Sequence, residues 1–99
     1  MDVRHDDREL SEMEIDRDYS GRWSFILDSF RTVMNLIRQV LNETELYQWK
    51  GLRLEKLSGD RSHQHSMRLN KQWRLIIEFE KRPGPNSNVC AVKAIEDYH

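Results

Sequence analysis

The residue types best suited to chemistry stand together at Asp97, Tyr98 and His99, after an apolar run. Histidine titrates near neutral pH, and Asp and Tyr can orient it or exchange a proton themselves. With arginines nearby, such a set could cleave RNA without a metal. A base takes the proton of the 2′-hydroxyl, an acid protonates the leaving 5′-oxygen, and arginines stabilise the pentavalent phosphate. The alternative is an end segment in which Tyr98 packs and the other side chains are solvated.

The arginines for such a site are expected from two neighbouring strands. Polar and apolar residues alternate over 67–70 and 73–80, and this alternation predicts strands with one buried face. Residues that oppose each other across a hairpin share a face. A three-residue turn therefore places Arg68 and Arg74 together on the solvent side and Trp73 on the side of the core.

A long amphipathic helix is expected to cover the buried face. Apolar side chains recur at helical spacing over 24–42, and Ser24 is a suitable N-cap. Another strand is expected over 52–55, where polar and leucine residues alternate. Ile76 is apolar on the solvent side, which predicts a central strand that is partly covered on both faces. The sheet as a whole is expected over 52–99.

Length and composition predict a single domain over 1–99. The 99 residues are 37% hydrophobic and 33% charged, and their aromatic content argues against disorder. No apolar run approaches the ~20 residues of a membrane span, and the charged start does not resemble a secretory signal. The single Cys90 excludes an internal disulfide and is expected in the core, in a reduced, cytoplasmic compartment. His63 and His65 lack a third ligand at motif spacing, so no metal site is expected.

The charges are divided along the chain although the net charge is only −1. Residues 1–20 hold eight acids and three bases, whereas residues 50–82 hold nine bases and four acids. A cationic sheet face suits the phosphates of RNA, although surface arginines on strands are ordinary. The acidic leader, with at most a short helix and an edge strand, either folds back over the basic face or forms a solubilising or partner-binding edge.

Three segments together resemble the HigB toxins of the RelE/ParE superfamily. They are Leu52-Arg53-Leu54-Glu55-Lys56-Leu57-Ser58-Gly59-Asp60-Arg61, His65-Ser66-Met67-Arg68-Leu69-Asn70-Lys71-Gln72-Trp73-Arg74 and Glu96-Asp97-Tyr98-His99. The resemblance covers 52–82 and 92–99 and extends to the helix over 24–42. It implies an α+β, RelE-like fold, in which N-terminal helices pack on one face of a small, mostly antiparallel, twisted sheet and the other face is concave and basic.

The resemblance also implies a function. Members are bacterial type II toxins that enter the ribosomal A site and cut mRNA as metal-independent endoribonucleases, without a cofactor. The implied partner is a HigA-like helix-turn-helix antitoxin, which alone would contact operator DNA; no membrane is involved. Asp97, Tyr98 and His99 match the catalytic tail of the family, and Arg74 matches an arginine that holds the scissile phosphate. The candidate RNA-binding residues are Arg53, Lys56, Arg61, Arg68, Asn70 and Lys71.

Two positions depart from the family pattern. Glu55 and Ser58 stand where relatives have His and Lys, so one cation and one acid/base group are missing. Glu55 becomes a candidate base, and Arg53 and Lys56 become the compensating cations. Two alternatives stay open: a gyrase inhibitor of the same superfamily, which the Asp-Tyr-His end disfavours, and a weak or inactive member that acts by binding.

Overall fold

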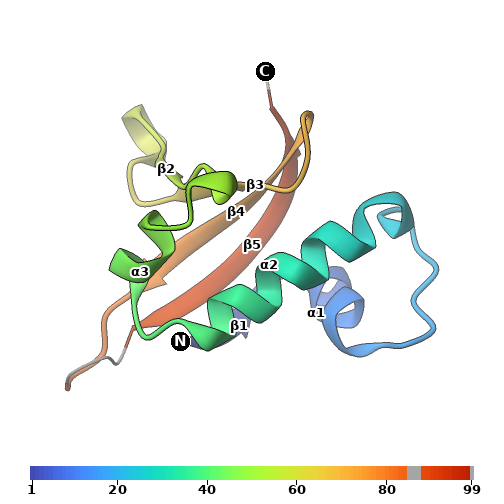
Figure 1. The fold of residues 1–99 in the computed structure, drawn as a ribbon, viewed down its shortest axis with the longest axis horizontal. Coiled ribbons are helices and arrows are strands. Elements are labelled where there is room, and N and C mark those ends of the chain that lie inside the picture. Colours follow the sequence, from blue (N-terminus) through green and yellow to red (C-terminus); the bar gives the residue numbers. More distant parts are fainter. Residues whose placement is uncertain (85–87, 99) are drawn as a thin grey trace.

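The computed structural model describes residues 1–84 and 88–98 and contains a five-stranded sheet with the order β1-β5-β4-β3-β2 (Figure 1). β1 runs parallel to β5, and the other neighbours are antiparallel. The strands are β1 (Asp2–His5), β2 (Glu55–Lys56), β3 (His65–Arg68), β4 (Trp73–Glu80) and β5 (Val89–Asp97). The predicted α+β class with a mostly antiparallel sheet is confirmed.

The long helix packs against one face of this sheet, and α1 lies beside it (Figure 1). The helices are α1 (Arg8–Ile15), α2 (Leu27–Gln39) and α3 (Glu43–Tyr47), with short 3-10 turns η1 (Ser24–Ile26), η2 (Lys50–Leu52) and η3 (Gly59–Arg61). The helix expected over 24–42 is therefore present as η1 and α2. Ser24 does not cap it, because its hydroxyl donates to the carbonyl of Gly21 (2.7 Å). None of the helices in the described ranges is long and apolar enough to cross a membrane.

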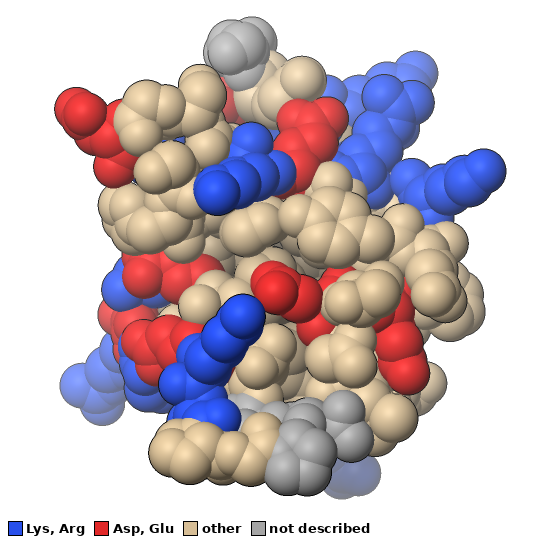
Figure 2. Space-filling model, turned by 90° about the vertical axis from the view of Figure 1, so that its left-hand side faces the viewer, with Lys and Arg blue, Asp and Glu red and all other residues tan. Residues whose placement is uncertain are grey.

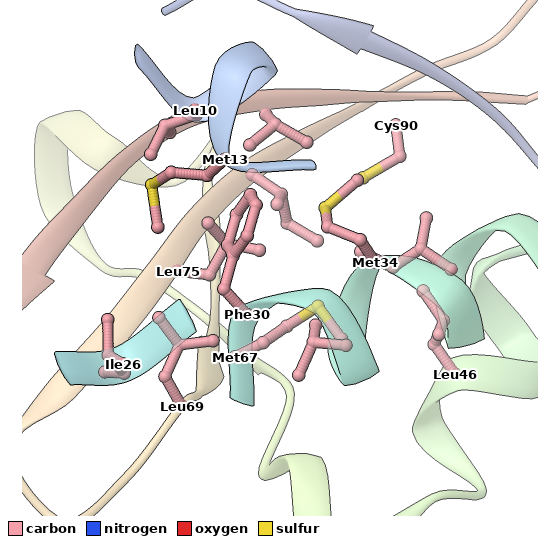
Figure 3. Packing of buried hydrophobic residues seen from close by; sticks show 14 of the residues in the cluster. Leu10, Met13, Ile26, Phe30, Met34, Leu46, Met67, Leu69, Leu75 and Cys90 are labelled. Carbon is pink, nitrogen blue, oxygen red and sulfur yellow. The ribbon is translucent and has the colours of Figure 1, made fainter. Parts of the chain in front are cut away.

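Side chains from all three helices and from the central strands form the core. Phe30 of α2 lies in the middle of this cluster (Figure 3) and is fully buried. The other fully buried side chains include Leu10, Met13, Met34, Ile37, Met67, Leu75 and Ile77. Cys90 is also buried here, and burial raises the pKa of its thiol to about 12. The cysteine therefore packs in the core as expected.

The acidic leader is an integral part of the fold. Its residues form β1, which pairs with β5, and α1, whose Leu10 and Met13 are fully buried. β1 is the edge strand farthest from β2. The hypothesis that residues 1–20 fold back over the basic face is therefore wrong, because packing and strand pairing hold them at the opposite edge.

A half-buried ionic cluster fastens α1 to α2 and β1. Both oxygens of Glu14 accept hydrogen bonds from Arg38 (2.6 and 2.8 Å), and one lies 2.7 Å from Nε2 of His5. The hydrogen bonds from Arg38, more than those from His5, lower the pKa of Glu14 below its ordinary value of 4.5. The folded state therefore favours the ionised carboxylate.

Replacing Glu14 by glutamine is expected to lower the free energy of unfolding at pH 7 by about 1–3 kcal/mol, since charge-assisted hydrogen bonds are lost. The pKa of Glu14 is depressed in the fold. Its stabilisation is therefore fully present above the unfolded value near 4.5 and disappears as the pH falls through the lower folded value. Urea unfolding of both proteins at pH 7 and pH 3 measures this effect. If the two proteins differ in unfolding free energy by the same amount at pH 7 and at pH 3, the prediction is contradicted.

The prediction of a strand over 52–55 is wrong. Residues Lys50–Leu52 form the turn η2, and Arg53 takes a left-handed conformation with φ 48°. This conformation is costly for a residue other than glycine, and it interrupts the extended chain. Only Glu55 and Lys56 pair with β3.

Trp73 faces the helical side, as predicted, but it is only half-buried. Its ring packs edge-on against Trp23 at a centroid distance of 5.1 Å and against Phe25 at 6.1 Å. These rings precede α2 or lie in η1, so Trp73 supports the entry to the long helix. Ile76 is 3% exposed on the central strand β4, which confirms that this strand is covered on both sides.

Candidate functional site

The face of the sheet opposite the helices, here called the open face, carries a basic pocket at the end near the β3–β4 turn. This pocket has a volume of about 200 Å³ and contains no acidic residue in its lining. The pocket is lined by Arg53, Arg68, Asn70, Lys71, Arg74 and Tyr98. Four cationic side chains around a small hollow suit one phosphate group.

The β3–β4 hairpin brings the two central arginines together. Arg68 and Arg74 are directly paired in the ladder, and the N–H of Leu69 donates to the carbonyl of Trp73 (3.0 Å). The turn therefore consists of residues 70–72, as the face-sharing argument predicts. The side-chain oxygen of Asn70 accepts from the N–H groups of Gln72 and Trp73 (2.8 Å each). Asn70 thus shapes the turn as well as lining the pocket.

Arg74 is held in a fixed position although it is charged and only 5% exposed. Its Nη1 donates to the backbone carbonyl of Arg53 (3.1 Å), and its guanidinium carbon lies 4.1 Å from the centre of the Tyr98 ring. A planar guanidinium is suited to such stacking. The left-handed residue Arg53 therefore presents its carbonyl to Arg74, while its own side chain lines the pocket.

The turn also holds the end of β5. The N–H of Tyr98 donates to the carbonyl of Gln72 (2.6 Å), and the side-chain amide of Gln72 donates to Asp97 (3.1 Å). These contacts place Tyr98 over Arg74 and leave its side chain about half exposed. Asp97 therefore helps to position Tyr98 through its hydrogen bond with Gln72.

A second pocket of about 180 Å³ adjoins the first and shares Arg74 and Tyr98 with it. The other residues that line it are Leu57, Arg61, Ser66, Ile76, Glu96 and Asp97. Arg61, an expected phosphate ligand, is paired here with Glu96 (2.9 Å for both bonds). Sequence reasoning missed Leu57 and Ser66 as site residues, although the alternation around Ser66 puts it on the open face.

Two further candidates are not in these pockets. Glu55 pairs with Ser66 and so shares the open face, but it is exposed and lines neither pocket. Lys56 pairs with His65, which pairs with the core residue Ile77, so Lys56 belongs to the helical face. Lys56 is thus separated from the other cations, and its part in RNA binding stays a prediction. His99 lies outside the described residues, and its candidacy rests on its place directly after Tyr98.

On the open face, cations away from the basic pocket are paired with carboxylates, whereas cations that line the pocket are not paired with any carboxylate of the described residues. Away from the basic pocket, Arg4 pairs with Glu80, and Lys93 pairs with Asp6 (2.9 Å). Figure 2 likewise shows Lys and Arg gathered at its upper right and interleaved with Asp and Glu over its lower half. Among residues 1–84 and 88–98, no carboxylate pairs with Arg68 or Lys71. On the open face, the basic pocket therefore gathers cations that no carboxylate of the described residues pairs with.

The comparisons with known proteins agree with this architecture. A family model for HigB-like toxins, described as RelE-like toxin of type II toxin-antitoxin system HigB, matches residues 6–99. A search of curated proteins finds no match. In the part of the chain that the structure describes, no group of three or more His, Cys, Asp or Glu side chains is arranged to hold a metal ion. The family match includes all three helices of the core and every residue of the two pockets, and the chain therefore belongs to the HigB-like family of RelE-like type II toxins.

Proposed function

We propose that this type II toxin is a ribosome-dependent endoribonuclease that cuts mRNA, and that the basic pocket holds the scissile phosphate. The observation that carries this proposal is the fixed guanidinium of Arg74, which lies between the Arg53 carbonyl and the Tyr98 ring in a pocket without acids. A preorganised cation of this kind stabilises charge that develops in a transition state. As a type II toxin, the protein has an antitoxin partner, which we propose to be HigA-like with a helix-turn-helix fold.

The proposed reaction is a transesterification. The 2′-oxygen attacks phosphorus, the bond from phosphorus to the 5′-oxygen breaks, and a 2′,3′-cyclic phosphate is left on the upstream fragment. A general base removes the 2′-hydroxyl proton, and a general acid protonates the leaving 5′-oxygen. His99 is our first candidate for one of these proton transfers, and Tyr98 is the candidate for the other. Arg68, Arg74 and Lys71 neutralise the phosphate, and Asp97 positions the end of β5.

Expression of the chain alone in bacteria tests this proposal against its alternatives. The 5′ ends of cellular mRNA are mapped, and the supercoiling activity of gyrase is measured in the same cells. Cuts within translated codons support the endoribonuclease. Loss of supercoiling without cuts identifies the gyrase inhibitor, and normal growth with the folded protein present identifies a member that acts by binding alone.

Replacing Arg74 by glutamine is expected to weaken the binding of single-stranded RNA by about 10- to 100-fold, since a charge-assisted contact to phosphate is lost. The slope of log affinity against log salt concentration should fall in magnitude by about one. Fluorescence anisotropy with a labelled RNA oligonucleotide measures both quantities. Arg74→Lys should keep the salt slope and recover only part of the affinity, because a lysine cannot stack and bind the Arg53 carbonyl in the same way.

Arg8 provides the matched control for this charge change. Its side chain is 94% exposed on α1, and its Nε lies 3.5 Å from Glu12. Arg8→Gln removes the same charge and should leave both the affinity and the salt slope unchanged. If it weakens RNA binding as much as Arg74→Gln, net charge and not the basic pocket determines the affinity.

A further inference from the structure

A two-pronged ion pair closes one side of the second pocket. Nη1 and Nη2 of Arg61 each donate to one oxygen of Glu96 (2.9 Å), and Nε donates to Gln64 (2.9 Å). This parallel geometry is the one in which a guanidinium also binds two oxygens of a phosphate. Glu96 therefore occupies the part of Arg61 that a phosphate would use.

The Arg61–Glu96 pair lies in the pocket that adjoins the basic pocket. Glu96 is the ladder partner of Arg74, and Arg61, Arg74 and Glu96 all line the second pocket. That pocket shares Arg74 and Tyr98 with the first. An RNA chain with one phosphate in the basic pocket would therefore bring an adjacent phosphate toward Arg61 and Glu96.

The segment over residues 57–64 holds Arg61 in place without Glu96. The N–H of Leu57 donates to the carbonyl of Gln64 (2.9 Å), and the Gln64 side chain donates to Glu78 on β4 (3.0 Å). Gly59 allows the tight turn between them with a φ of +64°. The side chains of Arg61 and Glu96 are 45% and 41% exposed, and pairs this exposed contribute little net stability. Replacement of Glu96 by another anion at Arg61 therefore costs the fold little stability.

We propose that Arg61 is a second phosphate-binding residue and that Glu96 occupies it as an internal competitor until RNA displaces the carboxylate. This inference rests on the proposed function, since it assigns the neighbouring phosphate of the same RNA substrate. In the free protein Glu96 neutralises Arg61 and repels RNA. Only an RNA already held in the basic pocket presents its next phosphate at a concentration high enough to replace the carboxylate. The pair thus lowers the affinity for RNA that is not positioned for cleavage.

A double-mutant cycle with single-stranded RNA tests the exchange. Glu96→Gln should tighten binding by about three- to tenfold, a change of the size expected for one nearby charge. Arg61→Gln should weaken binding and lower the magnitude of the salt slope by about one. In the double variant the gain from Glu96→Gln should disappear, because no guanidinium remains to be released. Anisotropy with a labelled RNA oligonucleotide gives all four affinities.

Glu80 provides the control, since it forms a similar two-pronged pair with Arg4 elsewhere on the open face. Glu80→Gln removes the same charge and should leave the RNA affinity unchanged. An equal gain from Glu80→Gln, or a gain from Glu96→Gln that persists without Arg61, would overturn the inference and leave the proposed function intact. If neither the parent nor Glu96→Gln binds RNA, both fail. If RNA binding follows the cycle but expression yields no mRNA cuts, only the proposed cleavage fails.

Discussion

Replacement of His99 by alanine is expected to lower mRNA cleavage by about 100- to 10,000-fold, the usual cost of removing a general acid or base. Growth inhibition should disappear at matched protein level. The melting temperature should change little, because the contacts that hold the end of β5 run through Tyr98, Asp97 and Gln72. Mapping of mRNA 5′ ends, together with thermal unfolding, measures the two effects separately. Antitoxin binding should be retained and is checked by co-purification.

His63 serves as the matched control for this substitution. Its side chain is 61% exposed and lies 3.8 Å from Glu78, outside both pockets. His63→Ala should leave cleavage and growth inhibition intact. If His99→Ala remains as toxic as the parent, His99 is neither the acid nor the base, and Glu55 becomes the next candidate because it shares the open face.

Phe30→Ala is expected to lower the free energy of unfolding by about 3–5 kcal/mol, because it leaves a large cavity in the core. Phe30 is fully buried between α2 and the sheet (Figure 3), so no solvent-facing rearrangement fills the space. Domains of this size have only ~5–15 kcal/mol of stability, and the variant should be close to unfolding at 37 °C. Urea-induced unfolding followed by tryptophan fluorescence gives the difference.

Phe25, five residues earlier in the chain, is the control for the loss of a phenyl ring. It is 64% exposed and packs against the rings of Trp23 and Trp73. Phe25→Ala should cost about 1 kcal/mol or less, the size of an aromatic pair contact. Equal losses for Phe25→Ala and Phe30→Ala would contradict the packing described for α2.

The elements that could be predicted are those in which local periodicity and burial agree. β4 and α2 are examples, since each shows one clear period in the sequence and covers the other in the fold. The three-residue turn after Leu69 followed from a geometric constraint on the hairpin. The prediction of a strand over 52–55 was wrong because Arg53 adopts a left-handed conformation, which the alternation of polar and apolar residues does not reveal. That conformation is stabilised by Arg74, which is distant in sequence.

The rest of the candidate site depends on contacts between distant segments. Arg61 reaches Glu96 because residues 57–64 lie on the open face. The sequence of that segment contains no pattern that predicts where it packs. The short helix and the edge strand expected in the leader are present, but where they pack could not be predicted for the same reason. Its two buried residues, Leu10 and Met13, stand among charged neighbours, and β1 finds its partner only in β5.

The parallel pairing of β1 with β5 has a consequence for the order of folding. Residues 2–5 pair with residues 89–92, so the ladder at this edge closes a loop that contains almost the whole chain. Closing a long loop costs entropy before any contact repays it, and such non-local pairing slows folding. A chain interrupted during synthesis before residue 89 therefore has neither the partner of β1 nor the strand that places Tyr98 over Arg74. Unfinished copies of this chain therefore lack the assembled basic pocket.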